Sequence, residues 1–279
     1  QGLTPTEEEA HFGLWCIMSS PLLIGCNLEN MPDSSLELLT NKELISLNQD
    51  PLGLQAYVAQ HENEGYVLVK DIEQKRGNVR AVALYNPSDT ICSFSVPFSS
   101  LEFGGNVKVR DLVKHSDLGN FSGTFEQTLP AHSAMFLRIE GETRLEPTLY
   151  EAEWAYLPLF NDLGKNPKGI IYAHDKEASG KMKVGFLGGQ PENYAEWREV
   201  YSENGGRYDM TIHYLYGKGR QIELDVNGII TKIDSLGKDN GHNQITVPVE
   251  LKAGYNTIRM GNSYNWAPDI DCFTLTKGM

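Results

Sequence analysis

Three consecutive carboxylates near the start of the chain, Glu7, Glu8 and Glu9, are the first residues whose type and spacing could do chemistry. Clustered acidic side chains could hold a divalent cation, because hard cations prefer oxygen ligands. The preceding residues offer a simpler explanation. Thr4 and Pro5 are typical of the start of a helix, and acidic residues are favoured at the positive end of a helix dipole. We therefore interpret the three glutamates as a solvated helix start.

Cysteine and histidine form no recognisable metal-binding or nucleophilic motif in this sequence. The cysteines lack the C-x-x-C spacing of zinc sites, and the histidines show no closely spaced pair. We expect buried free thiols, with disulfide bonds as the alternative. The positions are Cys16, Cys26, Cys92 and Cys272, and His11, His61, His115, His132, His174, His213 and His242.

Length and composition limit the classes of protein to consider. A chain of 279 residues is long enough for about two domains. The net charge of −13 argues against nucleic acid as a partner. No apolar run approaches the ~18 residues of a membrane span. Aromatic residues make up 10% of the chain, which suits sugar binding and a β-rich core equally well.

The first fifty residues are expected to be mostly helical. A helix beginning at Pro5 has Thr4 as its N-cap, and Glu7 completes a capping box. A second helical region covers residues 34–50. Between the two lie residues 22–24, Leu-Leu-Ile, which show no polar alternation. Such a run predicts a strand buried on both faces, as in a parallel sheet under helices, yet this part of the sequence offers it no neighbouring strand.

From residue 52 the hydrophobic period changes from 3.6 to 2. Six short strands separated by Gly, Asn, Pro and Asp turns are predicted within 52–140, which indicates an antiparallel β-sandwich. Residues 141–149 are a predicted linker. The block 150–279 is again β-rich, with its own Tyr and Trp core candidates, so we predict a separate domain there. The expected fold class is mainly β, behind a short helical region at 1–51.

The segments "GLTPTEEEAHFGLWCIMSSPLLIGCNL" and "LLTNKELISLNQDPLGLQ" closely resemble the C-terminal half of glycoside hydrolase family 27, the α-galactosidases. In that family they form helix seven, strand eight and helix eight of a TIM barrel, and an antiparallel β domain follows. The resemblance implies that residues 1–51 are the C-terminal remnant of a barrel and 52–140 the β domain. Residues 22–24 would be strand eight, with the other seven strands outside this sequence.

The same resemblance bears on catalysis. Family 27 enzymes are retaining glycosidases, which need two carboxylates about 5–5.5 Å apart. The resemblance places both catalytic aspartates on barrel strands four and six, upstream of Gln1, so we expect no catalytic residue in this chain. Asp33, Asp50 and Asp71 match no catalytic motif and are interpreted as cap, turn and surface positions.

A second resemblance covers about 150–277. "YEAEWA", "GGRYDMTIHYLYGKGRQIELDVNG" and "VPVELKAGYNTIRMG…PDIDCFTL" resemble carbohydrate-binding modules of families 35 and 6, which are β-sandwiches. In such modules an N-terminal Glu-x-Glu and a C-terminal Asp bind structural calcium, which implies Glu151, Glu153 and Asp271 as ligands here. Two exposed glutamates and a turn aspartate are the alternative. Carboxylates on alternate residues of one strand point the same way, and an aspartate from a neighbouring strand can complete an oxygen cage.

Sugar sites in these modules lie on loops, where an aromatic ring stacks on the pyranose and polar groups bind its hydroxyls. The segment "NSYNWAPDID" precedes the last predicted strand, where these modules often keep an asparagine and an aromatic residue. A core position for Trp266 is the alternative. The resemblance implies Trp266, Asn265, Tyr264 and Asn262 as carbohydrate-binding residues, with Tyr194, Trp197 and Arg220 as weaker candidates.

Together the resemblances imply the C-terminal portion of an α-galactosidase-like retaining hydrolase with an appended carbohydrate-binding module. Its partners would be a galactose-containing oligo- or polysaccharide and the missing N-terminal barrel of the same polypeptide. Its cofactor would be structural Ca²⁺ in the module, with none for catalysis, and its location secreted or periplasmic. The alternative is a free-standing carbohydrate-binding or adhesion protein without hydrolase activity.

Overall fold

The computed structural model describes residues 2–25, 27–62, 64–73, 77–161, 169–234, 236 and 240–278. The chain divides into two compact units, residues 1–145 (unit 1) and 146–279 (unit 2). The boundary falls within the predicted linker 141–149, although the last strand of unit 1 continues to Arg144 and the first strand of unit 2 begins at Leu149. Among the described residues, no helix has both the length and the apolarity to cross a membrane.

Unit 1 begins with short helices. The capping box predicted for the first helix is present: the Thr4 hydroxyl accepts a hydrogen bond from the backbone N–H of Glu7, and the Glu7 carboxylate accepts one from the N–H of Thr4. Asn41 caps the third α-helix, because its Oδ1 accepts hydrogen bonds from the backbone N–H groups of Glu43 and Leu44. The helices are α1 (Pro5–Ile17), η1 (Leu28–Asn30), α2 (Asp33–Leu39) and α3 (Lys42–Asn48).

The strand predicted at residues 22–24 is not formed. Residues 20–25 have no strand assignment, and the side chains of Leu23 and Ile24 are 83% and 60% exposed. The physical reason is the lack of a partner, since the described part of unit 1 offers these residues no ladder to join and an isolated strand leaves its backbone groups unpaired. The apolar run therefore lies on the surface of this chain.

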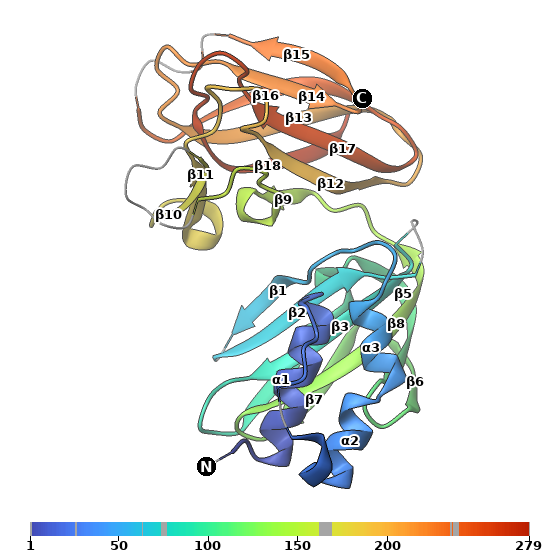
Figure 1. The fold of residues 1–279 in the computed structure, drawn as a ribbon. Coiled ribbons are helices and arrows are strands. Elements are labelled where there is room, and N and C mark those ends of the chain that lie inside the picture. The colour runs from blue at the N-terminus through green and yellow to red at the C-terminus, as the bar shows by residue number, and fades with distance from the viewer. Residues whose placement is uncertain are drawn as a thin grey trace. The chain divides into compact units, whose positions relative to one another are not determined.

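Antiparallel strands build the rest of unit 1 (Figure 1). The six predicted strands are confirmed, and two more, β6 and β7, are found. One sheet has the order β1-β2-β3-β8-β5-β6, and β4 pairs with β7. The bounds are β1 (Tyr57–Glu62), β2 (Gly65–Asp71), β3 (Val79–Asn86), β4 (Cys92–Pro97), η2 (Phe98–Leu101), β5 (Phe103–Asp111), β6 (Ser116–Ser122), β7 (Thr124–Leu129) and β8 (Ser133–Arg144).

The six-stranded sheet is covered on both faces. One face packs against β4 and β7, and the other against α1 and α3. Gly13 permits the close approach of α1, because a Cβ atom there would lie 2.1 Å from the ring of Phe136 on β8. The predicted surface position of Asp71 is wrong: it is 3% exposed and ion-paired with Arg80 and Arg144, because two arginines inside the unit require a buried counter-charge.

Unit 2 is a sandwich of two antiparallel sheets. One has the order β10-β11-β18-β13-β16, with β9 also paired to β18, and the other has the order β12-β17-β14-β15. Both contribute to one core, with Phe273 from the first and Ile258 from the second fully buried. The bounds are β9 (Leu149–Glu151), η3 (Ala152–Trp154), β10 (Ile171–His174), η4 (Ser179–Lys181), β11 (Met182–Gly185), β12 (Ala195–Ser202), β13 (Gly206–Leu215), β14 (Ile222–Val226), β15 (Ile229–Ile233), β16 (Asn243–Leu251), β17 (Gly254–Gly261) and β18 (Asp269–Lys277).

Candidate functional site

A bulge at the start of β18 determines which side chains meet there. His213 on β13 pairs with Cys272, and the next residue, Tyr214, pairs with Ile270, so Asp271 is an extra residue in the ladder. Ile270 and Phe273 both point into the core. A β-bulge breaks the strict alternation of side chains, so the two residues between them, Asp271 and Cys272, can share one side of the strand.

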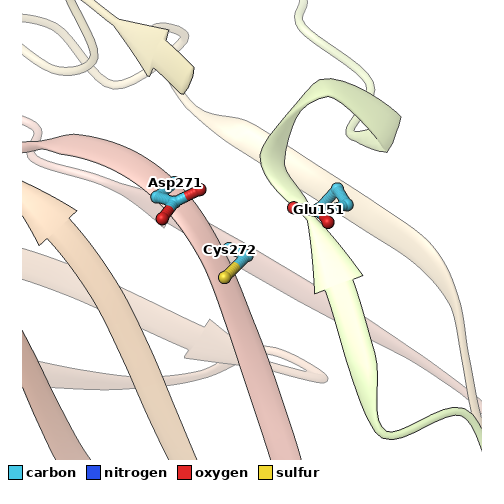
Figure 2. Close-up of side chains that lie close together, drawn as sticks. All are labelled: Glu151, Asp271 and Cys272. Carbon is cyan, nitrogen blue, oxygen red and sulfur yellow. The ribbon is translucent and has the colours of Figure 1, made fainter. Parts of the chain in front are cut away.

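Glu151 completes a group of potential metal ligands with these two residues (Figure 2). It lies at the end of β9, paired with Cys272 across the ladder. A carboxylate oxygen of Glu151, one of Asp271 and the sulfur of Cys272 lie within 4.8 Å of one another, and all three residues are buried. Ser179 holds both carboxylates, with its hydroxyl donating to Glu151 and its N–H donating to Asp271 at 2.9 Å.

Glu153 approaches the same place from η3. A Cβ atom on Gly180 would lie 2.5 Å from Oε1 of Glu153 and 3.9 Å from Cδ of Glu151, so both carboxylates line this glycine. Oε2 of Glu151 and Oε2 of Glu153 are buried without a hydrogen-bond partner. Burial, opposed by a hydrogen bond from its own backbone and reinforced by the charges of Glu151 and Asp271, raises the pKa of Glu153 to about 7.

The acidic side chains of this group share raised pKa values. Burial, and to a smaller extent Asp271, raises the pKa of Glu151, and burial is also the main cause of the raised pKa of Asp271. Burial and the neighbouring carboxylates raise the pKa of the Cys272 thiol. Several acidic groups with raised pKa values and unpartnered buried oxygens fit a positive ion, because its charge would satisfy them together.

The structure therefore brings Glu151, Glu153 and Asp271 to one place. Cys272 was missed by the sequence reasoning, because alternation along a regular strand would direct it away from Asp271. The predicted free and buried state is confirmed for Cys16 and Cys272, and Cys92 is buried as well, whereas Cys26 lies outside the described residues. Within the described part of the chain, the histidines do not join this ligand group.

The aromatic loop before β18 is held by Asn262. This side chain is 5% exposed, and its Oδ1 accepts hydrogen bonds from the backbone N–H groups of Tyr264 and Asn265. Its Nδ2 donates to the carbonyl of Gln221. Asn262 thus shapes the loop from inside, while Tyr264, Asn265 and Trp266 are exposed on the surface.

Two glycines fix this loop to the segment after β11. The N–H of Gly189 donates to the carbonyls of Asn262 and Asn265, and Gly188 forms a β-bridge with Trp266. Gly188 has φ +90°, and a Cβ there would lie 2.4 Å from the carbonyl oxygen of Asn265. Gly188 therefore permits a close backbone approach, a role that the sequence reasoning missed.

Trp266 is a surface residue and not part of the core. Its side chain is 46% exposed, and the ring of Phe186, which is 42% exposed, meets it edge-on at 6.1 Å between centroids. A half-exposed indole on a braced loop can stack on an apolar ring face. Tyr264, two residues earlier in the sequence, has a side chain that is 78% exposed.

The weaker candidates have separate roles. Trp197 is 4% exposed and its indole N–H donates to the carbonyl of Glu151, so it is a core residue and wrong as a ligand contact. The guanidinium carbon of Arg259 lies over the ring of Tyr194, 4.9 Å from the ring centroid. Arg220 donates to the carbonyl of Ala267 at 2.9 Å, which places it next to the aromatic loop.

Comparison with protein families identifies relatives of unit 1. Residues 1–50 match the family model "Alpha galactosidase A", and residues 64–139 match "Alpha galactosidase C-terminal beta sandwich domain". Similar proteins include α-galactosidase 3 of Arabidopsis thaliana, 39% identical over 134 residues that cover 47% of this chain and 31% of the relative. An α-galactosidase of Cyamopsis tetragonoloba is 33% identical over 47% of this chain and 32% of its own length.

The chain thus spans about a third of the length of these relatives. Among solved structures, the isomalto-dextranase of Arthrobacter globiformis T6, complexed with panose, matches 98% of this chain and 48% of its own, with a TM-score of 0.58 and 18% identity. At this identity the similarity concerns the fold alone, and it includes unit 2.

Proposed function

We propose that this chain, a relative of the α-galactosidases of glycoside hydrolase family 27 through unit 1, is the non-catalytic C-terminal portion of a retaining α-galactosidase-like hydrolase. In this proposal, unit 2 is its carbohydrate-binding module. Unit 1 would pack against the catalytic barrel of the same polypeptide. Unit 2 would bind a galactose-containing oligo- or polysaccharide and so raise the local concentration of substrate.

The braced aromatic loop is the observation that carries the binding part of this proposal. Trp266 is 46% exposed while the backbone beneath it is fixed through Gly188 and Gly189. A ligand that stacks on a pre-organised ring does not have to order the loop on binding, which lowers the free-energy cost of association. Asn265 and Tyr264 lie at the same surface, where they can bind sugar hydroxyl groups.

A calcium ion is the proposed cofactor of unit 2. Glu151, Asp271 and Glu153 supply the hard oxygen ligands that Ca²⁺ prefers, and the two unpartnered oxygens among them fit such an ion. The ion would stabilise the fold by joining β9 to β18 and would take no part in catalysis. These carboxylates are not a glycosidase pair, since Glu151 and Asp271 are each 6% exposed and a sugar cannot reach them.

An apolar cleft on unit 1 supports the proposed contact with a barrel. It has a volume of about 420 Å³, and the exposed side chains of Leu23 and Ile24 form part of its lining. Exposed apolar surface of this kind is typical of an interface. Its lining includes Leu3, Phe12, Trp15, Leu22, Met31 and Leu38.

Affinity electrophoresis of the full chain tests the proposed binding. Galactomannan in the gel should retard the chain, while unsubstituted mannan and dextran at the same concentration should retard it less. Unchanged mobility in galactomannan would contradict a galactose-directed module. A hydrolase whose module binds polysaccharide is also expected to be secreted or periplasmic, which fractionation of the source cells would check.

A further inference from the structure

We propose that Cys272 makes the buried ligand group of unit 2 a mixed sulfur–oxygen site, which binds a thiophilic divalent cation of the zinc class more tightly than calcium. This inference rests on the calcium site proposed above, because both use Glu151 and Asp271. It differs in the ion selected and in the residue that selects it. A site built for calcium alone has no use for a sulfur ligand.

The geometry brings the thiol into the ligand group. The bulge at Asp271 lets the side chains of Asp271 and Cys272 share one side of β18, and Glu151 lies across from them on β9 (Figure 2). The three ligand atoms are within 4.8 Å of one another. A tetrahedral zinc ion with bonds of 2.0–2.3 Å requires ligand atoms about 3.5 Å apart. Changes in side-chain torsion angles can supply this contraction.

The site also contains a buried carboxylate oxygen that a bound cation would satisfy. Glu151 is 6% exposed, and its Oε2 has no hydrogen-bond partner. Cys272 is 4% exposed beside it. A buried carboxylate oxygen left unpartnered is costly unless a positive group binds to it. The ligand group therefore combines a sulfur atom with a buried carboxylate oxygen that has no hydrogen-bond partner.

Ligand softness determines which cation is preferred. Calcium is bound by oxygen ligands, whereas a thiolate selects zinc and similar ions. On binding, the proton of the Cys272 thiol leaves to solvent and a bond forms between Sγ and the metal. Glu151 and Asp271 supply two oxygen ligands, and Glu153 or a water molecule supplies the fourth ligand.

Cadmium is a suitable probe, because a bond between cadmium and a thiolate absorbs in the near ultraviolet. The full chain, stripped with EDTA, is titrated with Cd²⁺, Zn²⁺ and Ca²⁺ by calorimetry and absorbance. We expect one equivalent of Cd²⁺ to produce the thiolate band, and Kd values for Cd²⁺ and Zn²⁺ at least about tenfold below that for Ca²⁺. The cadmium NMR shift of the wild-type complex reports sulfur ligation without any substitution.

Variants identify the residues responsible. Cys272→Ser should abolish the band and weaken Cd²⁺ binding at least about tenfold, while Ca²⁺ binding stays within about twofold. Cys92→Ala, a buried cysteine of unit 1, should retain the band. Glu151→Gln should weaken the binding of all three ions.

The outcomes separate the two proposals. Calcium binding without a cadmium band would overturn the present inference and leave the calcium site standing. A band that survives Cys272→Ser would overturn the assignment of the ligand. If no ion binds, both proposals fail.

Discussion

Glu151 and Asp271 lie at opposite ends of the sequence of unit 2 yet share one buried ligand group, and both accept a hydrogen bond from Ser179. The strand pairing of β9 with β18 brings them together. An ion bound between them would join the first and last strands of the sandwich to the turn at η4. The stability of unit 2 should therefore depend on metal.

Calcium should raise the melting temperature of unit 2. At a concentration a hundredfold above Kd, the ion should stabilise the folded state by about 2.7 kcal/mol, which corresponds to a shift of about 10 °C. Calorimetry with EDTA and with Ca²⁺ measures this shift. Glu151→Gln should abolish it, while Glu29→Gln, an exposed glutamate of unit 1, should leave it intact. Equal melting temperatures in EDTA and Ca²⁺ would contradict the site.

The metal-free protein should become less stable as pH rises between the unfolded-state and folded-state pKa values of Glu153. Its pKa is raised from 4.5 to about 7 in the folded state, so between these values the folded state binds more protons than the unfolded state. The free energy of unfolding of unit 2 should fall as pH rises from 4.5 to 7. Denaturant titrations in EDTA at several pH values measure this slope.

Glu153→Gln should flatten that slope, because the amide does not titrate. Calcium should reverse the trend, since the ion binds the deprotonated carboxylates and its affinity rises with pH. A slope that is the same in wild type and Glu153→Gln would show that Glu153 is not the group responsible.

Gly188→Ala should disrupt the aromatic loop. The added Cβ would lie 2.4 Å from the carbonyl oxygen of Asn265, and the φ of +90° is unfavourable for alanine. Gly219→Ala is the matched control, because Gly219 has φ +71° and an added Cβ there would meet no atom within 4 Å, so the change should cost only about 1 kcal/mol. We expect Gly188→Ala to lose retention on galactomannan and Gly219→Ala to keep it. Equal retention of the two variants would show that the loop conformation does not matter.

The chain alone should not hydrolyse an aryl α-galactoside. Unit 1 is similar to α-galactosidases, but in our proposal both catalytic aspartates lie outside this sequence. Release of the aryl group is followed by absorbance against a mock preparation from the same host. Turnover above that background, lost on a substitution within this chain, would refute the proposal.

The sequence predicted most of the architecture, because hydrophobic periodicity and turn residues act locally. Strand β6 escaped detection since Ser116–Ser122 is polar and mostly exposed at the edge of the sheet, so it shows no apolar alternation. Residues 22–24 show the opposite failure. Their apolar pattern predicts a strand, but a strand also needs a partner, and pattern alone does not supply one.

The candidate site was predicted in part. The family resemblance implied that Glu151 and Asp271 are ligands of one site. The presence of Cys272 in the same group depends on a bulge that inserts one extra residue into the ladder, which the sequence pattern does not reveal. Asn262 supports the loop through hydrogen bonds to its backbone, and Gly188 permits a neighbouring segment to pack closely against it. Both roles depend on how the backbone packs. Long-range packing of this kind cannot be derived from composition or period.

The central claim, that unit 2 binds carbohydrate through the loop before β18, is tested most directly by galactomannan affinity electrophoresis of Trp266→Ala. Trp15→Ala is the matched control, because Trp15 is a 39% exposed tryptophan of unit 1. Loss of the stacking ring should weaken binding by about 2 kcal/mol, roughly thirtyfold, with little change in melting temperature. Retarded migration of Trp15→Ala together with free migration of Trp266→Ala is the predicted result. Wild-type retardation of Trp266→Ala would contradict the account.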